Sequence, residues 1–213
     1  YMKPEEFDFS RKELEEIAGG EKKIGKIFLK RTDLHHDSSH KPVSAFSSVF
    51  FAKHILKAKK IITETGASMN ARAVASACAK LNLSCEVHIG ALDAEKVSLN
   101  KDITELYGAD IKVCHDSTKS LLPAMAAALR SWQSDPTAMY VVGSVCGPHP
   151  YPLMVRTFAS IIGRIAKKQM KDLIGKSPST VFAVCGGGSN LSAISYPFYN
   201  EKNVDIFGIE SAG

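Results

Sequence analysis

Three glycines at 186–188 stand between an apolar stretch and two small polar residues, Ser189 and Asn190. The stretch before them, 180–185, is rich in β-branched residues and predicts a buried strand, and the residues after them predict a helix. The backbone N–H groups of such a loop can bind an anion. The spacing matches neither a Walker loop, which needs a lysine, nor a GxGxxG fingerprint. We therefore expect the phosphate of another cofactor here; a glycine-rich turn without a ligand is the alternative.

A second candidate for chemistry is Lys41, which lies between His40 and Pro42 at the start of an expected helix over 43–57. A cation at a helix N-terminus opposes the helix dipole, and such a local conflict favours a functional role. A lysine removed from water has a depressed pKa and can form a Schiff base. The alternative is an ordinary solvated lysine on a loop.

The third candidate is Glu64, which follows a short strand expected over 60–63. A partly buried carboxylate at the end of a strand can act as general acid and base. The loop that follows, 65–70, leads into a helix, and its N–H groups can hold a substrate carboxylate. Alternatively, Glu64 only caps the next turn.

Strand and helix patterns alternate along the chain and must position these residues. We expect strands over 26–30, 60–63, 84–89, 110–114, 139–142, 180–185 and 205–209, and helices over 10–18, 43–57, 71–81, 93–107, 120–131 and 155–173. This alternation predicts an α/β fold with parallel sheets and helical crossovers. Ligands of such sheets bind beyond the carboxyl ends of the strands. The loops at 65–66, 143–144 and 186–188 lie at such ends, so we expect them to converge on one ligand.

The composition excludes several classes of protein. The 213 residues carry a formal net charge of +5. No apolar run reaches the roughly 18 residues of a membrane span, and we expect that the charged N-terminal stretch is not a secretory signal. The five cysteines lack zinc-like spacing, which favours buried thiols in a reducing compartment. Basic residues are not interleaved with aromatic ones, so we expect neither a nucleic acid nor a membrane as partner.

The order of motifs points to a family. In sequence, these are LKRTDL at 29–34, HK at 40–41, ITETGA at 62–67, GSVCGPHPYP at 143–152, MVR at 154–156, GGGSN at 186–190 and GIE at 208–210. This series closely resembles the β subunit of tryptophan synthase, a pyridoxal-phosphate enzyme of fold type II, over residues 26–213. The GPHPYP segment and the GGGSN loop are its most specific parts.

The resemblance implies a fold of two lobes, each with three α/β/α layers around a parallel sheet. Family members continue beyond the position of Gly213, so we expect the second lobe to be incomplete and the chain to be truncated or divergent. On this basis, residues 1–39 belong to the second lobe with an N-terminal extension. Residues 40–158 form the N-terminal lobe with a mobile substrate subdomain, and 159–213 begin the C-terminal lobe with the phosphate loop.

The resemblance also implies roles for individual residues. Lys41 corresponds to the lysine that bonds covalently to the cofactor, and Glu64 to the catalytic acid and base. The residues that correspond to the cofactor site of the family are His40, Lys41, Gly186, Gly187, Gly188, Ser189 and Asn190. Those that correspond to its substrate site are Thr65, Gly66, Ala67, Ser68, Met69, Asn70, Gly143 and Ser144.

The implied function is a pyridoxal-phosphate-dependent carbon–oxygen lyase that replaces the hydroxyl of L-serine with indole to give L-tryptophan. The family also implies a monovalent cation, a homodimer and an α-type subunit as partner; other metals are left open. The implied location is the cytoplasm, or a plastid in a plant-type host. The family's usual Gly-Gln-His-Gly after ETGA is here Ser68-Met69-Asn70-Ala71, and Pro42-Val43-Ser44 replace a run with Asn. Two alternatives therefore stand: a fold-type II enzyme with a different amino acid substrate, and an inactive homologue that acts as a binding partner.

Overall fold

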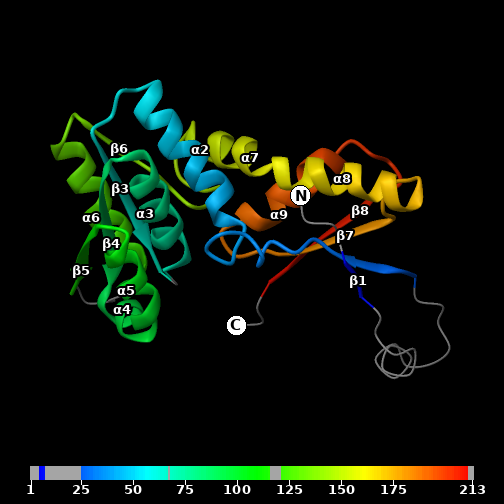
Figure 1. Ribbon diagram of the computed structural model, residues 1–213, viewed down its shortest axis with the longest axis horizontal. Helices are drawn as coiled ribbons and strands as arrows, with labels where there is room; N and C mark the ends of the chain where they lie inside the picture. Colours follow the sequence, from blue (N-terminus) through cyan, green and yellow to red (C-terminus); the bar gives the residue numbers. More distant parts are fainter. Residues whose placement is uncertain (1–4, 8–24, 67, 116–120, 211–213) are drawn as a thin grey trace.

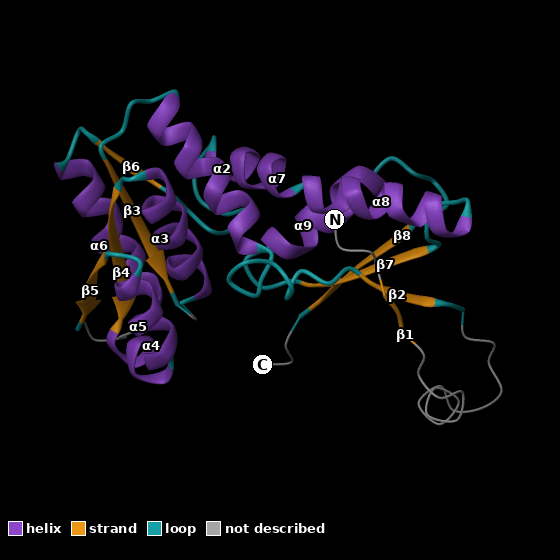
Figure 2. Cartoon of the chain, in the orientation of Figure 1, coloured by secondary structure: helices purple, strands orange, loops and turns teal. Residues whose placement is uncertain are grey.

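Two parallel sheets form the framework of the protein (Figure 1), in a computed structural model that describes residues 5–7, 25–66, 68–115 and 121–210. The larger sheet has the strand order β5-β4-β3-β6, with β3 (Lys60–Thr65), β4 (Ser84–Gly90), β5 (Ala109–Cys114) and β6 (Ala138–Tyr140). The smaller pairs β7 (Thr180–Val184) with β8 (Asp205–Ile209), and a short antiparallel pair joins β1 (Glu5–Phe7) to β2 (Ile27–Leu29). The two parallel sheets lie at opposite ends of the elongated arrangement in Figure 2.

The central strand β3 is buried because it has a neighbouring strand on each side and helices on both faces. On one face, Ile61 packs with side chains of α2 (Lys41–His54) and α3 (Met69–Leu81). On the other, Ile62 packs with Tyr140 and with α6 (Leu121–Ser134). Burial on both faces explains why parallel strands of this kind are continuous apolar runs with few polar residues. The polar residues at the end of β3 are therefore exceptions to the pattern.

The smaller sheet is covered on one face only within the described residues. Helices α8 (Ile161–Ile174) and α9 (Ser189–Ser195) and the turn η1 (Tyr196–Phe198) lie over one face, while α7 (Tyr151–Ala159) lies between α2 and α9. On the opposite face, Phe182 and Val184 are 65% and 67% exposed, and Phe207 and Ile209 are each 49% exposed. The rings of Phe182 and Phe207 stack at 5.3 Å between centroids. We call these four side chains the open face of β7–β8.

The single helix expected over 93–107 is wrong: two helices, α4 (Ala91–Lys96) and α5 (Ser98–Leu106), occupy this segment. The break lies at Val97, whose φ of −124° and ψ of 37° are not helical. A β-branched residue loses side-chain freedom in a helix, which makes Val97 a weak point. Gly108, two residues after the end of α5, adopts a left-handed φ of +85°.

The single helix expected over 155–173 is also wrong, because it begins earlier and is divided into α7 and α8 at Ser160. The Ser160 hydroxyl donates a hydrogen bond to the carbonyl oxygen of Thr157 at 2.7 Å. Side-chain hydrogen bonds of this kind compete with the helix ladder and bend helices. Similarly, α2 begins at Lys41 and ends at His54, not at 43 and 57.

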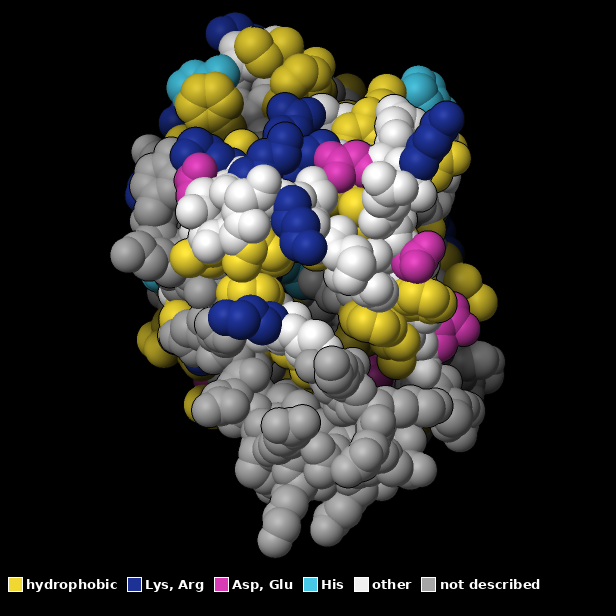
Figure 3. Space-filling view, turned by 90° about the vertical axis from the view of Figure 1, so that its right-hand side faces the viewer, with side chains coloured by type: hydrophobic (Ala, Val, Ile, Leu, Met, Phe, Trp, Pro, Cys, Tyr) yellow, Lys and Arg dark blue, Asp and Glu magenta, His cyan; other side chains and the backbone are white. Residues whose placement is uncertain are grey.

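The predicted α/β class with parallel sheets and helical crossovers is confirmed. The helix expected over 10–18 lies outside the described residues, and the lobe boundaries at 39/40 and 158/159 remain a prediction. Within the described ranges, no helix has the length and apolar character to cross a membrane. The end of the molecule seen in Figure 3 mixes Lys and Arg side chains with hydrophobic ones, so its charge is dispersed.

Candidate active site

Lys41 is the first residue of α2, and its side chain points to the end of the larger sheet. Its ammonium group donates to the carbonyl oxygen of Gly143 and to the hydroxyl oxygen of Ser189, the latter at 3.2 Å. The backbone N–H of Lys41 donates to the Ser39 hydroxyl at 3.2 Å. Burial lowers the pKa of Lys41, while the charges of Glu64 and Cys146 oppose this shift. The amine is therefore easier to deprotonate than that of an ordinary surface lysine.

His40 lies beside Lys41 and contacts the same serine. Its Nε2 atom is 2.9 Å from the Ser189 hydroxyl, within hydrogen-bond distance. Burial, together with the charges of Lys41 and His35, lowers the pKa of His40 to about 4. The ring is therefore neutral near pH 7 and can offer either a donor or an acceptor to a ligand.

The glycine loop at 186–188 packs closely against the segment 143–145. The carbonyl oxygen of Gly187 accepts a hydrogen bond from the Val145 N–H at 3.1 Å. A Cβ atom at Gly187 would lie 2.8 Å from Ser144, and one at Gly188 would lie 2.6 Å from Val145. Gly188 also has a left-handed φ of +80°. Close packing and backbone conformation thus both require glycine at this position.

A cleft of about 610 Å³ opens beside this loop. It is lined by Leu29–Asp33, Ser38–Lys41, Val184 and Gly186–Asn190. It therefore brings together all residues that the sequence assigned to the cofactor. None of the residues assigned to the substrate belongs to this lining.

Glu64 lies near Lys41 but faces the side of the sheet covered by α6. The Tyr140 hydroxyl donates a hydrogen bond to its carboxylate, while its Oε2 atom is buried without a partner among the described residues. Burial raises the pKa of Glu64, although the bond from Tyr140 and the charge of Lys41 act against this. A carboxyl group with a raised pKa can hold a proton near neutral pH and exchange it with a substrate.

The loop assigned to the substrate is partly turned inward. The side-chain amide of Asn70 donates to the Thr63 hydroxyl at 2.9 Å and to the carbonyl oxygen of Glu64 at 3.1 Å. Asn70 also fills the space next to Gly143, where a Cβ would lie 2.0 Å from its Oδ1 atom. Ser68 has a left-handed φ of +61°. Asn70 therefore stabilises the strand end, and its amide is occupied by these contacts.

The remaining assigned residues are placed as follows. Thr65 is buried, Gly66 and Met69 are half-buried, Ser144 meets the glycine loop, and Ala67 lies outside the described residues. The Asn190 amide donates to the Val184 carbonyl oxygen at 3.1 Å, so it stabilises the loop. No group of three or more His, Cys, Asp or Glu side chains in the described part could hold a metal ion.

Sequence reasoning missed two residues that shape the site. Tyr140 was expected only as part of a strand, yet its hydroxyl bonds to Glu64. Ser39 was given no role of its own, yet it accepts a hydrogen bond from the backbone of Lys41. Tyr140 shares a sheet face with Ile62 and Glu64 because the parallel register pairs it with Ile62, and a sequence does not contain that register. Nothing in the sequence indicated the role of Ser39.

Parallel strands, a half-buried lysine and a close-packed glycine loop are together typical of enzymes that bind a phosphorylated cofactor. Over residues 9–213 the chain matches the pyridoxal-phosphate dependent enzyme family, and it belongs to that family. It is similar to the tryptophan synthase beta chain of Afipia carboxidovorans, with 39% identity over 212 residues, which are 99% of this chain and 51% of the relative. The beta chain of Acinetobacter calcoaceticus is 42% identical over 195 residues, with 90% of this chain and 48% of the relative covered. The chain thus spans about half the length of these relatives.

Solved structures confirm the fold, which is that of fold-type II enzymes. A threonine deaminase superposes with a TM-score of 0.67 at 19% identity, over 86% of this chain and 53% of that one. The serine racemase of Dictyostelium discoideum gives a TM-score of 0.69 at 15% identity, over 100% of this chain and 60% of that one. At such low identity, the similarity concerns the fold alone.

Proposed function

We propose that this chain carries the cofactor-binding half-site of an enzyme of the tryptophan synthase β type. The whole enzyme would bind pyridoxal phosphate and replace the hydroxyl of L-serine with indole, in the cytoplasm, as a homodimer with an α-type partner. The observation that supports this best is the convergence of Lys41, Gly143 and Ser189 at one point. Lys41 and Gly143 belong to the predicted lobe 40–158, and Ser189 belongs to the predicted phosphate loop in 159–213, so this contact connects the two.

The residues present fit a ligand with an aldehyde and a phosphate. The half-buried amine of Lys41, with its lowered pKa, is a nucleophile for the aldehyde. The glycine loop at 186–188 has no side chains to obstruct a phosphate, and it borders the same cleft as His40 and Ser189. His40 and Ser189 add polar groups that orient a bound phosphate.

Glu64 would move the proton of the reaction. The cofactor, when bound, withdraws electrons from the α-carbon of an amino acid. The carboxyl group of Glu64, whose pKa burial raises, would in its protonated form donate a proton to the departing hydroxyl of serine. The resulting carboxylate would then accept the proton that indole loses. Tyr140 would hold Glu64 in place during both transfers, and Lys41 would move the proton of the α-carbon.

The test is covalent labelling of Lys41 by pyridoxal phosphate. The purified chain is mixed with the cofactor, reduced with borohydride and digested, and the labelled peptide is identified by mass spectrometry. We expect labelling at Lys41, a visible absorbance band that Lys41→Ala abolishes, and a shift of that band with L-serine. Lys53, also half-buried on α2, provides a matched control variant, Lys53→Ala, which should keep the band. A band that survives in Lys41→Ala, or the same labelling at Lys53, would contradict the proposal.

A fold-type II enzyme for another hydroxy or thio amino acid is the second candidate. It is favoured by Ser68 in its left-handed conformation and by Asn70, whose amide is already bonded to the strand end. These features leave fewer donors for the carboxylate of serine than an open glycine loop would. A spectral shift with L-threonine or O-acetylserine at concentrations where L-serine has no effect would decide for this candidate.

A further inference from the structure

A buried carboxylate outside the cleft links the loop before Lys41 to two helices. The side chain of Asp37 is fully buried, at 0% exposure. Its Oδ1 atom accepts a hydrogen bond from Arg72 Nε at 3.2 Å and another from the Tyr107 hydroxyl at 3.0 Å. Arg72 belongs to α3, and Tyr107 is the residue after α5. We call Asp37, Arg72 and Tyr107 the latch.

The backbone at the latch is held in a conformation that non-glycine residues rarely adopt. Asp37 has a φ of +63° and Ser38 a φ of +54°. Two successive residues in the left-handed region persist only where surrounding contacts enforce them. The ion pair of Asp37 with Arg72 supplies such a contact. The next residue, Ser39, accepts the N–H of Lys41, so the latch is connected to the lysine within four residues.

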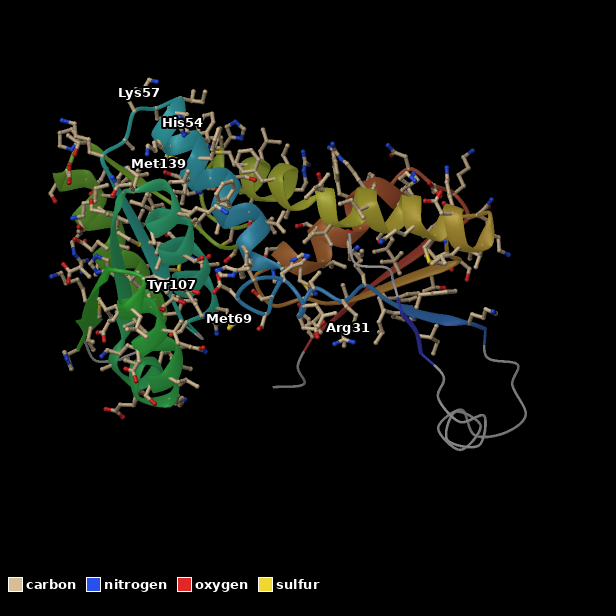
Figure 4. All side chains as sticks on the ribbon, viewed as in Figure 1. Arg31, His54, Lys57, Met69, Tyr107 and Met139 are labelled. Atoms are coloured by element: carbon tan, nitrogen blue, oxygen red, sulfur yellow. The ribbon has the colours of Figure 1, made fainter. Side chains whose placement is uncertain are left out.

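The other side of the latch reaches the turn assigned to the substrate. Arg72 donates from Nη1 to the Asn100 side chain at 3.3 Å, and the Asn100 amide lies 4.0 Å from the sulfur of Met69. The backbone N–H of Arg72 also donates to the carbonyl oxygen of Ser68 at 3.0 Å. Figure 4 shows Tyr107 and Met69 together in the lobe of the four-stranded sheet, while Arg31 lies toward the other sheet. Arg72 thus contacts both the loop of Lys41 and the turn at 68–70.

We propose that Asp37 is a positioning residue that fixes the loop of Lys41 relative to the substrate turn at 68–70. A charged pair in a buried place holds its geometry strongly, because either partner left alone would be a buried unpaired charge. Burial and the bond to Asp37 both raise the pKa of Tyr107, so its hydroxyl remains a donor. The importance of this coupling for catalysis rests on the proposed function, but the coupling itself concerns only this chain.

The first test is amide hydrogen exchange on the purified chain without cofactor. In Asp37→Asn we expect exchange at least tenfold faster both in residues 33–41 and in 68–72, with β7 unchanged. The matched control is Glu105→Gln, which removes an exposed ion pair with Lys101 two residues from Tyr107 and should change neither segment. Unchanged exchange in both segments, or acceleration in 33–41 alone, would overturn the proposal.

Two further variants guard against simple unfolding. Tyr107→Phe removes one hydrogen bond but keeps the ring and the ion pair, and it should accelerate the same two segments to a smaller extent. In Asp37→Asn combined with Arg72→Gln, the acceleration should be smaller than the sum of those in the two single variants, because both substitutions remove the same ion pair. Additive acceleration in the double variant, or no change in Tyr107→Phe, would count against the latch.

The second test measures the initial rate and pH midpoint of Lys41 labelling by pyridoxal phosphate. Asp37→Asn should slow the labelling of Lys41 or shift its pH midpoint, whereas Glu105→Gln should do neither. If the rate and the midpoint are both unaltered in Asp37→Asn, Asp37 has a merely structural role and does not position Lys41. If Lys41 is not labelled in the unmodified chain, the proposed function fails, while the exchange result still decides on the latch.

Discussion

At Gly188, backbone strain and side-chain crowding can be measured separately. In Gly188→Ala, the new residue must adopt a φ of +80°, and its Cβ would lie 2.6 Å from a methyl group of Val145. The left-handed conformation costs an alanine roughly 1–2 kcal/mol, and crowding of this kind about 1–3 kcal/mol. We expect the free energy of unfolding to fall by about 2–5 kcal/mol, the sum of the two costs.

The neighbouring glycines provide controls within the same loop. A Cβ at Gly186 would meet no atom within 4 Å, so Gly186→Ala should change the stability of the chain by less than about 0.5 kcal/mol. A Cβ at Gly187 would lie 2.8 Å from Ser144 without a positive φ, so Gly187→Ala should show the crowding loss alone. Adding Val145→Ala to Gly188→Ala should remove the crowding at 188 and leave the backbone strain. The stability that Val145→Ala loses by itself is measured separately and subtracted.

The assay is urea unfolding of the four variants and of Val145→Ala alone, followed by circular dichroism at one temperature and pH. The midpoint and slope together give the free energy of unfolding for each. If Gly186→Ala loses as much stability as Gly188→Ala, neither strain nor crowding is the cause. The interpretation of the loop as a close-packed cradle would then be refuted.

Three further predictions concern single residues of the site. Because the pKa of Glu64 is raised in the folded chain, its contribution to the free energy of unfolding is present at low pH and is lost as pH rises through the folded pKa. Glu64→Gln should flatten this decline when the free energy of unfolding is measured from about pH 4 to 9. A curve for Glu64→Gln that runs parallel to that of the unmodified chain would contradict the prediction. Because burial lowers the pKa of His40 from 6.5 to about 4, the free energy of unfolding should fall as pH drops through this range. The NMR signals of the His40 ring should titrate near pH 4, and a midpoint near 6.5 would refute the burial argument. Asn70→Ala should lower the free energy of unfolding by about 1–3 kcal/mol, because the Thr63 hydroxyl and a backbone carbonyl lose a buried donor. Asn203→Ala, in an exposed turn without a positive φ, serves as comparison in the same unfolding assay, and equal losses would count against the prediction.

The regular elements were predictable where a local pattern is sufficient. The strand at 60–65 has a β-branched apolar run, and the helix at 69–81 an alanine-rich periodic one, and both form close to the expected bounds. The breaks at Val97 and Ser160 were missed because neither position carries Gly or Pro. They depend on a dihedral change and on a side-chain hydrogen bond, which a periodicity does not contain.

The cofactor half of the site was more accessible to sequence reasoning than the substrate half. The glycine run and the lysine at a helix start are local signals, and the structure brings these residues to one cleft. Tyr140 lies 76 positions after Glu64, so their hydrogen bond follows only from the strand order. The inward turn of Asn70 depends on the space left by Gly143, a contact between distant segments. The roles of the assigned residues remain predictions until the labelling test is done.

The open face of β7–β8 has a consequence for the behaviour of the chain in solution. Its apolar side chains attract those of other molecules, whereas the net charge of +5 makes the molecules repel each other. Salt screens the repulsion over about 10 Å at 0.1 M and leaves the attraction between apolar surfaces intact. Light scattering should therefore show dispersed chains at low ionic strength and self-association as salt is added, and Phe182→Lys should move that onset to higher salt.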